Sequence, residues 1–257
     1  MTKRRDFLRT TALATGAFVA GRMLSPAEAL AQRFLAQEAP DIEKLLLQAV
    51  DALRSAGASF GDARIGRYRN QNIFTREQQI VNVVDSDSIG LGVRALVNGT
   101  WGFGATRDLT ADGVATAVRE AVAIARANRL PGVPPVILAP GQNHGRQTWK
   151  SAYVTDPWDI ALEEKAQMLF QANAEALKVP TVRFVSSGMA FVKEEKHYAN
   201  TLGTITSQTI IRTDVPFTAT AVAPDNSDSQ SRGNVVQPIG RGYEYVIEQD
   251  IVNNSRF

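Results

Sequence analysis

Apolar residues recur every three or four positions in three stretches of the chain, and this spacing predicts three amphipathic helices. The first is expected over residues 42–53, with Asp41 as its N-cap. The second is expected over 110–128, where Thr110 can cap the first turn. The third is expected over about 159–177. Each helix would bury one apolar stripe and leave a polar face in water.

The remaining stretches are rich in Val, Ile, Thr and Phe, often alternating with polar residues, which is typical of β-strands. Strands are expected over residues 62–84, 89–97, 100–105, 181–192, 196–200, 204–213 and 217–222. Residues 224–242 are polar and glycine-rich and predict a loop, after which 243–252 could form a further helix. The pattern therefore predicts an α+β fold, a mixed or antiparallel sheet with β-hairpins packed against about three amphipathic helices.

The pair Asn98-Gly99 is the strongest turn signal in the chain, because both residues accept the positive φ of a type I′ hairpin turn. Glycines alternate along the two strands that flank it, which predicts a flat strip on one face of the sheet. An aromatic ring or another backbone could lie close to such a strip. The glycines of this expected strip are Gly90, Gly92, Gly102 and Gly104. The scattered aromatic residues expected to pack in a core or an interface are Phe74, Trp101, Phe103, Trp149 and Trp158.

The first residues have the pattern of a twin-arginine export signal: paired arginines, a Phe-Leu pair, a short apolar stretch and small residues before a cleavage point. The residues of the signal are Arg4, Arg5, Phe7 and Leu8, and those of the cleavage site are Ala29 and Ala31. The alternative is an ordinary amphipathic N-terminal helix. Residues 1–31 are thus expected to be a signal peptide and 32–40 a leader. The apolar stretch is too short to cross a bilayer, so we expect export to the periplasm or the medium without a permanent membrane anchor.

Removal of the signal changes the charge of the protein. The whole chain has a formal net charge of +2, and residues 1–31 contain five basic and two acidic side chains, so the remainder carries −1. A protein that binds nucleic acid needs a clustered basic face, and the sequence shows none. The chain also has no cysteine, which excludes disulfides, thiolate metal sites and a cysteine nucleophile. The hydrophobic content of 44% is ordinary for a globular protein.

The residues alone do not compose an active site. The two histidines, His144 and His197, lack the helical spacing of a zinc peptidase, and His197 is expected to be structural or solvated. Gly90-x-Gly92 lacks the third glycine and the strand–turn–helix context of a dinucleotide site. Residues 85–88 lack the later glycine and glutamate of a calcium loop, which favours a polar turn. Residues 186–188 lack the elbow of a serine hydrolase.

The predicted hairpin, read together with the residues that follow it to Leu109, closely resembles the N-terminal signature of the TldD/PmbA family. Its matching residues are Gly90, Gly92, Arg94, Gly99, Trp101, Gly102 and Phe103. The stretch from Asn200 to Gly203 resembles the family's "asparagine, any, any, glycine" turn between two long strands. The resemblance extends over roughly residues 41–250, and it implies that these residues have structural or interface roles.

The resemblance also implies an activity for longer relatives. TldD-type members look like zinc metallopeptidases that act as dimers on unfolded or flexible peptides, inside a lumen between the subunits. Their zinc ligands lie on a His-Glu-x-x-x-His helix and a later cysteine in a C-terminal half. This sequence contains neither, so no catalytic or metal residue of the family can be placed on it. Residues 41–257 are expected to be the N-terminal domain, with a possible internal boundary near 130–147 and without the C-terminal metal-binding domain.

Three functions follow as hypotheses. The first is a non-catalytic N-terminal domain of an exported zinc metallopeptidase, which contributes to dimerisation and to the enclosed cleft. The second is a metal-lacking scaffolding or binding partner of a separate catalytic subunit. The third is an unrelated periplasmic binding module. The expected partners are a related subunit, a peptide substrate where a catalytic half exists, and the twin-arginine export machinery; zinc is expected only in a full-length homologue.

Overall fold

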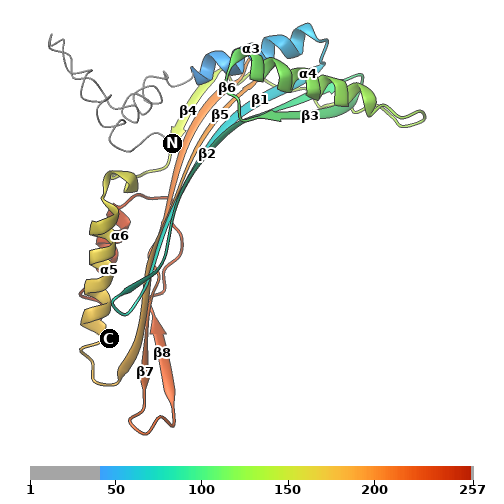
Figure 1. The fold of residues 1–257 in the computed structure, drawn as a ribbon. Helices are drawn as coiled ribbons and strands as arrows, with labels where there is room; N and C mark the ends of the chain where they lie inside the picture. Colours follow the sequence, from blue (N-terminus) through green and yellow to red (C-terminus); the bar gives the residue numbers. More distant parts are fainter. Residues whose placement is uncertain (1–40, 256–257) are drawn as a thin grey trace, which may run out of the picture. The chain divides into compact units, whose positions relative to one another are not determined.

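The computed structural model describes residues 41–255, which lie in the second of two units, 1–40 and 41–257. The predicted signal peptide and leader therefore lie outside the described residues. Within 41–255 the chain forms one eight-stranded sheet and four α-helices (Figure 1). The predicted α+β class is thereby confirmed.

The three predicted helices are present, and each begins and ends within about three residues of its expected bounds. The helices are α3 (Ile42–Ser55), α4 (Ala111–Ala127), α5 (Leu162–Ala176) and α6 (Glu244–Gln249), together with a 3-10 helix η1 (Pro157–Asp159). The strands are β1 (Phe60–Arg76), β2 (Gln79–Val97), β3 (Thr100–Thr106), β4 (Arg146–Lys150), β5 (Val182–Asn200), β6 (Ile205–Asp214), β7 (Phe217–Val222) and β8 (Ser229–Gly233).

The sheet has the strand order β3-β2-β1-β5-β6-β4, and β7 pairs with the first residues of β5 and with β8. All pairs are antiparallel except β4 with β6. Strands β1, β2 and β5 have 17 to 19 residues each and run the length of the sheet. These three strands therefore extend from one end of the sheet to the other.

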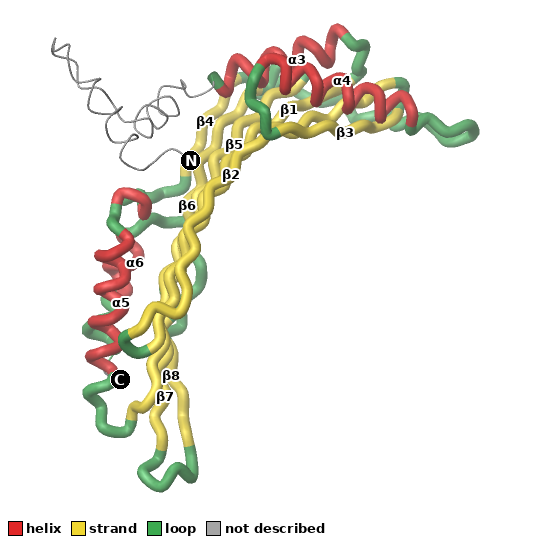
Figure 2. Tube along the Cα trace, viewed as in Figure 1, coloured by secondary structure: helices red, strands yellow, loops and turns green. Residues whose placement is uncertain are grey.

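All four helices cover the same face of the sheet (Figure 2). On β1 the odd-numbered Ala63 and Ile65 pack under α3 and α4, and Ile73 packs under α5. Because alternate residues of a strand share a face, the even-numbered residues of β1 point to the opposite side. We call these sides the helix-covered face and the open face.

Two apolar cores lie on the helix-covered face. The amino-terminal core is formed by α3, α4 and the strands beneath them, with Leu46, Leu53 and Val93 at its centre. The carboxy-terminal core lies between α5, α6 and the other end of the sheet, around Leu169 and Phe191. The stretch of sheet between the two cores is charged. There Arg67 Nη2 lies 2.5 Å from Asp87 Oδ2, and hydrogen bonding to Arg67 lowers the pKa of the Asp87 carboxyl.

Several sequence predictions are wrong in their details. Residues 62–84 are extended as predicted, but a two-residue turn at Glu77-Gln78, which was not predicted, separates β1 from β2. The polar turn expected at residues 85–88 lies inside β2, where Asp85 and Asp87 pair with side chains of β1. The strands expected at 181–192 and 196–200 are one strand, β5. Strand β8 forms within the loop expected at 224–242, and β4 was not expected at all.

Candidate interaction surfaces of the sheet

The predicted turn at Asn98-Gly99 is confirmed. Asn98 has φ 53° and Gly99 has φ 77°, the left-handed values that a type I′ turn requires. A Cβ atom at Gly99 would also lie 2.2 Å from Pro135 Cβ, because the segment after α4 returns across this turn. Arg129 Nη1 donates a hydrogen bond to Asn98 O at 2.7 Å. The turn is therefore held both by its own backbone and by the chain that crosses it.

The four glycines of the hairpin do not form one strip, because the register of the hairpin places them on opposite faces. Gly102 and Gly104 face α4, where a Cβ atom would lie 1.9 Å from Ala121 O and 2.1 Å from Ala117 O, respectively. Gly92 pairs with Ala105 and lies on the open face, where a Cβ atom would lie 3.2 Å from the ring of Phe103. The glycine pattern thus serves two contacts: a helix backbone on one face and an aromatic ring on the other.

Arg94 and Trp101 join a cluster on the open face. Arg94 Nε donates to both carboxylate oxygens of Asp62 at 3.1 and 3.0 Å, and Asp62 is only 1% exposed. The hydrogen bond to Asp62 raises the pKa of Arg94. The Arg94 guanidinium lies 5.5 Å from the ring centroid of Trp101, whose ring meets Phe60 edge-on at 6.0 Å. Arg94 thus neutralises a buried carboxylate while its own plane covers an aromatic ring.

The turn between β5 and β6 also uses its matching residues structurally. Asn200 Oδ1 accepts hydrogen bonds from Leu202 N at 3.0 Å and from Thr204 N at 3.1 Å. Gly203 has φ 97°, and a Cβ atom there would lie 2.7 Å from Asn143 Nδ2. The asparagine therefore closes the turn, and the glycine supplies the left-handed conformation.

The open face holds a groove of about 480 Å³. The groove is lined by Arg64, Ile65, Gly66, Tyr68, Lys196, His197, Tyr198, Thr206 and Gln208. The Arg64 guanidinium lies 5.4 Å from the ring centroid of Tyr198, and the ring of Tyr68 lies beside Gly66. Cations, tyrosines and a bare glycine backbone side by side suit a peptide segment with acidic or aromatic side chains.

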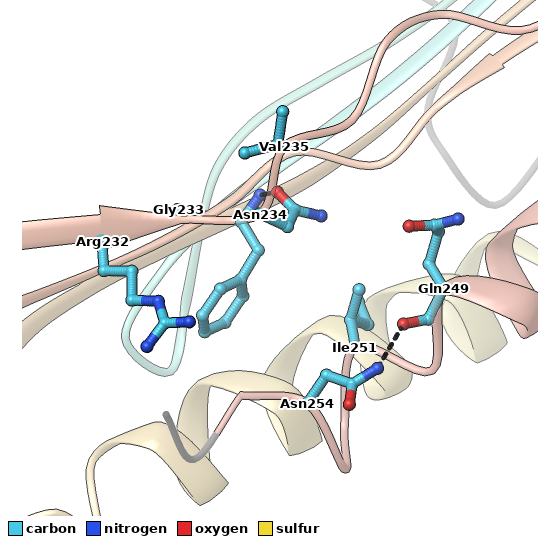
Figure 3. Close-up of a pocket in the computed structure, with 8 residues that line it drawn as sticks. Arg232, Gly233, Asn234, Val235, Gln249, Ile251 and Asn254 are labelled. Carbon is cyan, nitrogen blue, oxygen red and sulfur yellow. Dashed lines mark hydrogen bonds between the residues drawn. The ribbon is translucent and has the colours of Figure 1, made fainter.

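A second pocket, of about 300 Å³, lies beside the end of β8 (Figure 3). Its residues are Phe217, Arg232, Gly233, Asn234, Val235, Gln249, Ile251 and Asn254. The amides at this pocket are already bonded within the chain. Asn254 Nδ2 donates to Gln249 O at 3.0 Å, and Asn234 Oδ1 accepts from Phe217 N at 2.8 Å. These amides hold the segments of the chain together.

Neither histidine lies in a group of metal ligands. His197 Nδ1 and Ser207 Oγ lie 3.0 Å apart, which agrees with the structural role expected for His197. His144 is placed by its backbone N–H, which donates to Thr204 Oγ1 at 2.9 Å. Within residues 41–255 no three His, Cys, Asp or Glu side chains lie close enough together to hold a metal ion. Nor does that part of the chain include a helix with the length and apolar character needed to cross a membrane.

The structure reveals one residue that the sequence analysis did not single out. Lys165 of α5 is fully buried, and its Nζ donates to Gln71 Oε1 and, at 2.6 Å, to Pro157 O. The amine also lies 4.8 Å from the ring centroid of Phe191. Burial lowers the pKa of Lys165 to about 8, although nearby carboxylates such as Asp85 oppose this. The signal was its helical spacing from Leu169, which places a lysine on the apolar stripe of α5.

Three of the five scattered aromatic residues do not pack in a core. Phe74, Phe103 and Trp149 are 42%, 55% and 54% exposed, respectively, and all three lie on the open face. An interface role for these three stays a prediction. Trp101 and Trp158 are half-buried; Trp158 lies beneath the guanidinium of Arg69 at 4.8 Å.

Two family profiles match the chain in succession. Residues 61–125 match PmbA/TldA metallopeptidase domain 1, and residues 155–254 match the PmbA/TldA metallopeptidase central domain. Together the two matches cover more than half of the chain. No curated protein matches it.

Solved structures share the fold at low sequence identity. A protein described as a modulator of a DNA gyrase from Thermotoga maritima matches with a TM-score of 0.55 and 15% identity, over 75% of this chain and 42% of its own. A second such protein, from Bacteroides thetaiotaomicron, matches with 0.57 and 15%, over 80% and 48%. TldE from Thermococcus kodakarensis matches with 0.54 and 10%, over 81% and 47%. The chain thus spans less than half the length of each of these relatives.

Proposed function

The chain belongs to the PmbA/TldD metallopeptidase family, and from this premise we propose that it is the non-catalytic amino-terminal domain of an exported zinc metallopeptidase that acts on unfolded or flexible peptides. The observation that carries the proposal is the succession of domain 1 and the central domain in a sequence without the His-Glu-x-x-x-His motif. The domain contributes to a dimer with a related subunit and to the cleft that encloses the peptide.

The open face supports this role. It presents an uncovered surface of long strands, and its groove places Arg64 and Lys196 beside two tyrosines. A peptide without secondary structure has side chains of every kind to offer such a surface, and a wall of cations and aromatic rings can hold acidic or aromatic ones. The domain's task is then to position peptide rather than to cleave it.

The residues of this chain do not fit zinc. The described part offers no cluster of ligands, and the whole sequence has two histidines and no cysteine. Zinc in such an enzyme would be held by a C-terminal half, where it would activate the water that attacks the peptide bond. No chemical step is assigned to any residue of this chain.

An alternative function rests on the same missing motif. The chain would be a metal-lacking scaffolding or binding partner that pairs with a separate catalytic subunit. Both proposals place the chain outside the cytoplasm, in the periplasm or the medium. The support for this location is the sequence pattern of Arg4-Arg5 and Ala29-x-Ala31. This pattern is a signal that the twin-arginine export machinery recognises.

The intact mass and zinc content of the product isolated from its source test the proposal. A product that begins near Gln32, extends past residue 257 and binds zinc supports the amino-terminal domain. A product that ends at residue 257, contains no zinc and co-purifies with a related zinc-bearing subunit supports the alternative. Hydrolysis of an unstructured peptide by residues 32–257 alone would overturn both. Retention of an uncleaved N-terminus would contradict export.

A further inference from the structure

Strand β2 has a long edge without a neighbour. It pairs with β1 along its length but with β3 only from Leu91 to Val97. Residues Gln79–Ile89, which we call the free edge, have no second strand beside them among the described residues, and every one of them is exposed. Figure 1 shows β2 continuing well beyond the end of β3.

Apart from one β-bulge between Ile80 and Asn82, the free edge lacks the usual protection against strand pairing. Natural edges carry lysines, prolines or inward charges that discourage a second strand, whereas this stretch contains no Lys, Arg or Pro. Its exposed apolar residues are Ile80, Val81, Val83, Val84 and Ile89, which are 36–58% exposed. Its two aspartates are already engaged, Asp87 with Arg67 and Asp85 with Gln71 Nε2 at 2.7 Å. The free edge is therefore a template for another β-strand.

From Asn82 to Ile89 the backbone of the free edge points outward at the odd-numbered residues, whereas a β-bulge opposite Phe74 and Thr75 interrupts the alternation before Asn82. In a hairpin with a two-residue turn the flanking pair, here Val97 and Thr100, exchanges hydrogen bonds, so Val97 faces β3. Leu96 O accordingly faces β1, where it accepts from Ser59 N at 2.9 Å. The alternation continues along β2, so Val83 and Asp85 direct their N–H and C=O groups away from β1.

We propose that the free edge pairs antiparallel with the free edge of a second copy of this chain, with the two Val84 residues facing each other across a two-fold axis. Val84 is the midpoint of Gln79–Ile89, so this register brings the two free edges together over their full length, with the bulged residues 80–82 of each copy opposite residues 86–88 of the other. The boundaries agree with the axis: residue 91, where β3 ends, falls opposite residue 77 in the turn of the other copy. Neither β3 nor the turn then overlaps the partner strand.

Charge selects the same register. Around Val84, Asp85 falls opposite Val83 and Asp87 opposite Val81, so no two aspartates meet. A centre at Asp85 would place identical carboxylates face to face, and a centre at Ser86 would oppose Asp85 with Asp87. Like charges directly opposite each other destabilise a strand pair. An isologous interface of this kind continues one sheet through both copies, with the helices on the same side.

This inference rests on the dimerisation in the proposed function and names the strand that carries it. It does not depend on peptidase activity, on zinc or on export. A chain without any link to peptide cleavage could still pair through β2, and a peptidase domain could pair elsewhere. Measurements of oligomeric state and position-specific cross-linking therefore separate the two proposals.

The absence of cysteine makes cross-linking position-specific. Val84→Cys in the 257-residue chain places two thiols on the axis in a non-hydrogen-bonded pair, whose Cα atoms lie about 4.5 Å apart, within disulfide range. Oxidation should convert most of the protein to a covalent dimer. Ile80→Cys is the matched control, because residue 80 is also exposed but faces residue 88 of the partner, and it should remain mostly uncrosslinked. Equal yields at the two positions, or none at residue 84, would overturn the proposal.

A second pair of variants tests the interface without a disulfide. Val84→Lys places two like charges on the axis and should convert the dimer to a monomer in light scattering, whereas the β-branched Val84→Thr should remain dimeric. Circular dichroism of the lysine variant shows whether the fold persists. A wild-type chain that is monomeric, or a Val84→Lys variant that dimerises as well as wild type, would mean that another segment or partner covers the free edge and would overturn the proposal.

Discussion

The two cores share two strands, β1 and β5, yet they are built by opposite means. In the amino-terminal core, the backbone of α4 lies directly on β3 at Gly102 and Gly104, and the surrounding side chains are apolar. In the carboxy-terminal core, α5 contributes Lys165 and Asn173, both fully buried. The first core depends on close packing that admits no added atom. The second also depends on the hydrogen bonds that Lys165 and Asn173 donate, because a buried donor without a partner is costly; the Oδ1 atom of Asn173 has no partner among the described residues.

The polar groups of the carboxy-terminal core also shape the sheet. Asn173 Nδ2 donates to Thr75 Oγ1 at 3.1 Å and to Glu77 O at 2.7 Å. Thr75 Oγ1 in turn lies 2.8 Å from Ser187 Oγ on β5. Helix α5 thereby holds the β1–β2 turn through hydrogen bonds of a buried side chain. Helix α4 instead holds its hairpin by backbone contact at Gly102 and Gly104, together with hydrogen bonds from Thr100 Oγ1 to Ala125 O and from Asn128 Nδ2 to Trp101 O. Substitutions that test packing should therefore affect the first core most, and changes of pH should affect the second.

The largest effect is expected from Gly102→Ala. The added Cβ atom would lie 1.9 Å from Ala121 O and 2.4 Å from Ala125 N, both backbone atoms of α4. Because a helix backbone cannot move aside without loss of its contacts, we expect a loss of about 3 kcal/mol or more in the free energy of unfolding. Urea unfolding followed by circular dichroism measures this loss.

The matched control is Gly90→Ala in the same hairpin. A Cβ atom there lies on the open face, 3.4 Å from its nearest neighbour, Thr106 O, which is an ordinary contact. Its effect on the free energy of unfolding should be under about 1 kcal/mol, because the loss of glycine flexibility in the unfolded chain favours alanine. Equal losses in the two variants would contradict the assignment of the glycines to different faces.

The amino-terminal half was the easier half to predict from sequence. Its helices have side-chain caps at Asp41 and Thr110, and its hairpin turns on Asn98-Gly99, so each signal lies within a few adjacent residues. The faces of the glycines follow from the same turn, although the alternation of glycines along each strand suggested a single strip. A two-residue turn pairs Val97 with Thr100, so even-numbered residues of β2 oppose odd-numbered residues of β3, and the glycines of the two strands fall on opposite faces.

The carboxy-terminal half was harder because its signals are tertiary. Glu77 adopts φ 48° although neither Gly nor Asn is present in the turn. The conformation is held by Val185 O, which accepts from Glu77 N, and by Asn173, which donates to Glu77 O. Lys165 was missed for a similar reason, since lysine at a helical core position is buried only where partners such as Gln71 await it. The helical spacing places Lys165 on the apolar stripe, but the partners that allow a lysine to be buried there lie far away in the sequence.

The second prediction concerns pH and Lys165. Its folded pKa is lowered from 10.5 to about 8 by burial, so the folded chain favours the neutral amine more than the unfolded chain does. The stability linked to this amine is therefore fully present above pH 10.5 and is lost as the pH falls through about 8. The shift in pKa corresponds to about 3 kcal/mol in the free energy of unfolding, which is somewhat less than the largest loss expected for Gly102→Ala.

The comparison that isolates this contribution is wild type against Lys165→Met. All other ionisable groups are present in both proteins, so only the difference between the two unfolding free energies is informative. We expect this difference to shift in favour of wild type by up to about 3 kcal/mol between about pH 7 and about pH 10. A difference that stays constant with pH would show that Lys165 keeps its ordinary pKa and would remove the electrostatic contrast between the cores.

The smallest effect on stability is expected at the N-termini of α4 and α5. There one substitution can remove the cap of the first helix and another can add a cap to the second. The side chain of Thr110 accepts from Gly113 N at 3.2 Å and caps α4, whereas Ala161 before α5 provides no side-chain cap. Ala161 is exposed with φ −61° and ψ 144°, an N-cap conformation, and Glu164 stands three residues later. Ala161→Ser would therefore complete a capping box and should stabilise the chain by about 1 kcal/mol, while Thr110→Ala should destabilise it by a similar amount.

Combining the two substitutions should restore wild-type stability, because the two helices cover different cores and the effects of distant substitutions add. Urea midpoints of the three variants that did not sum in this way would mean that the two cores are coupled through the strands they share.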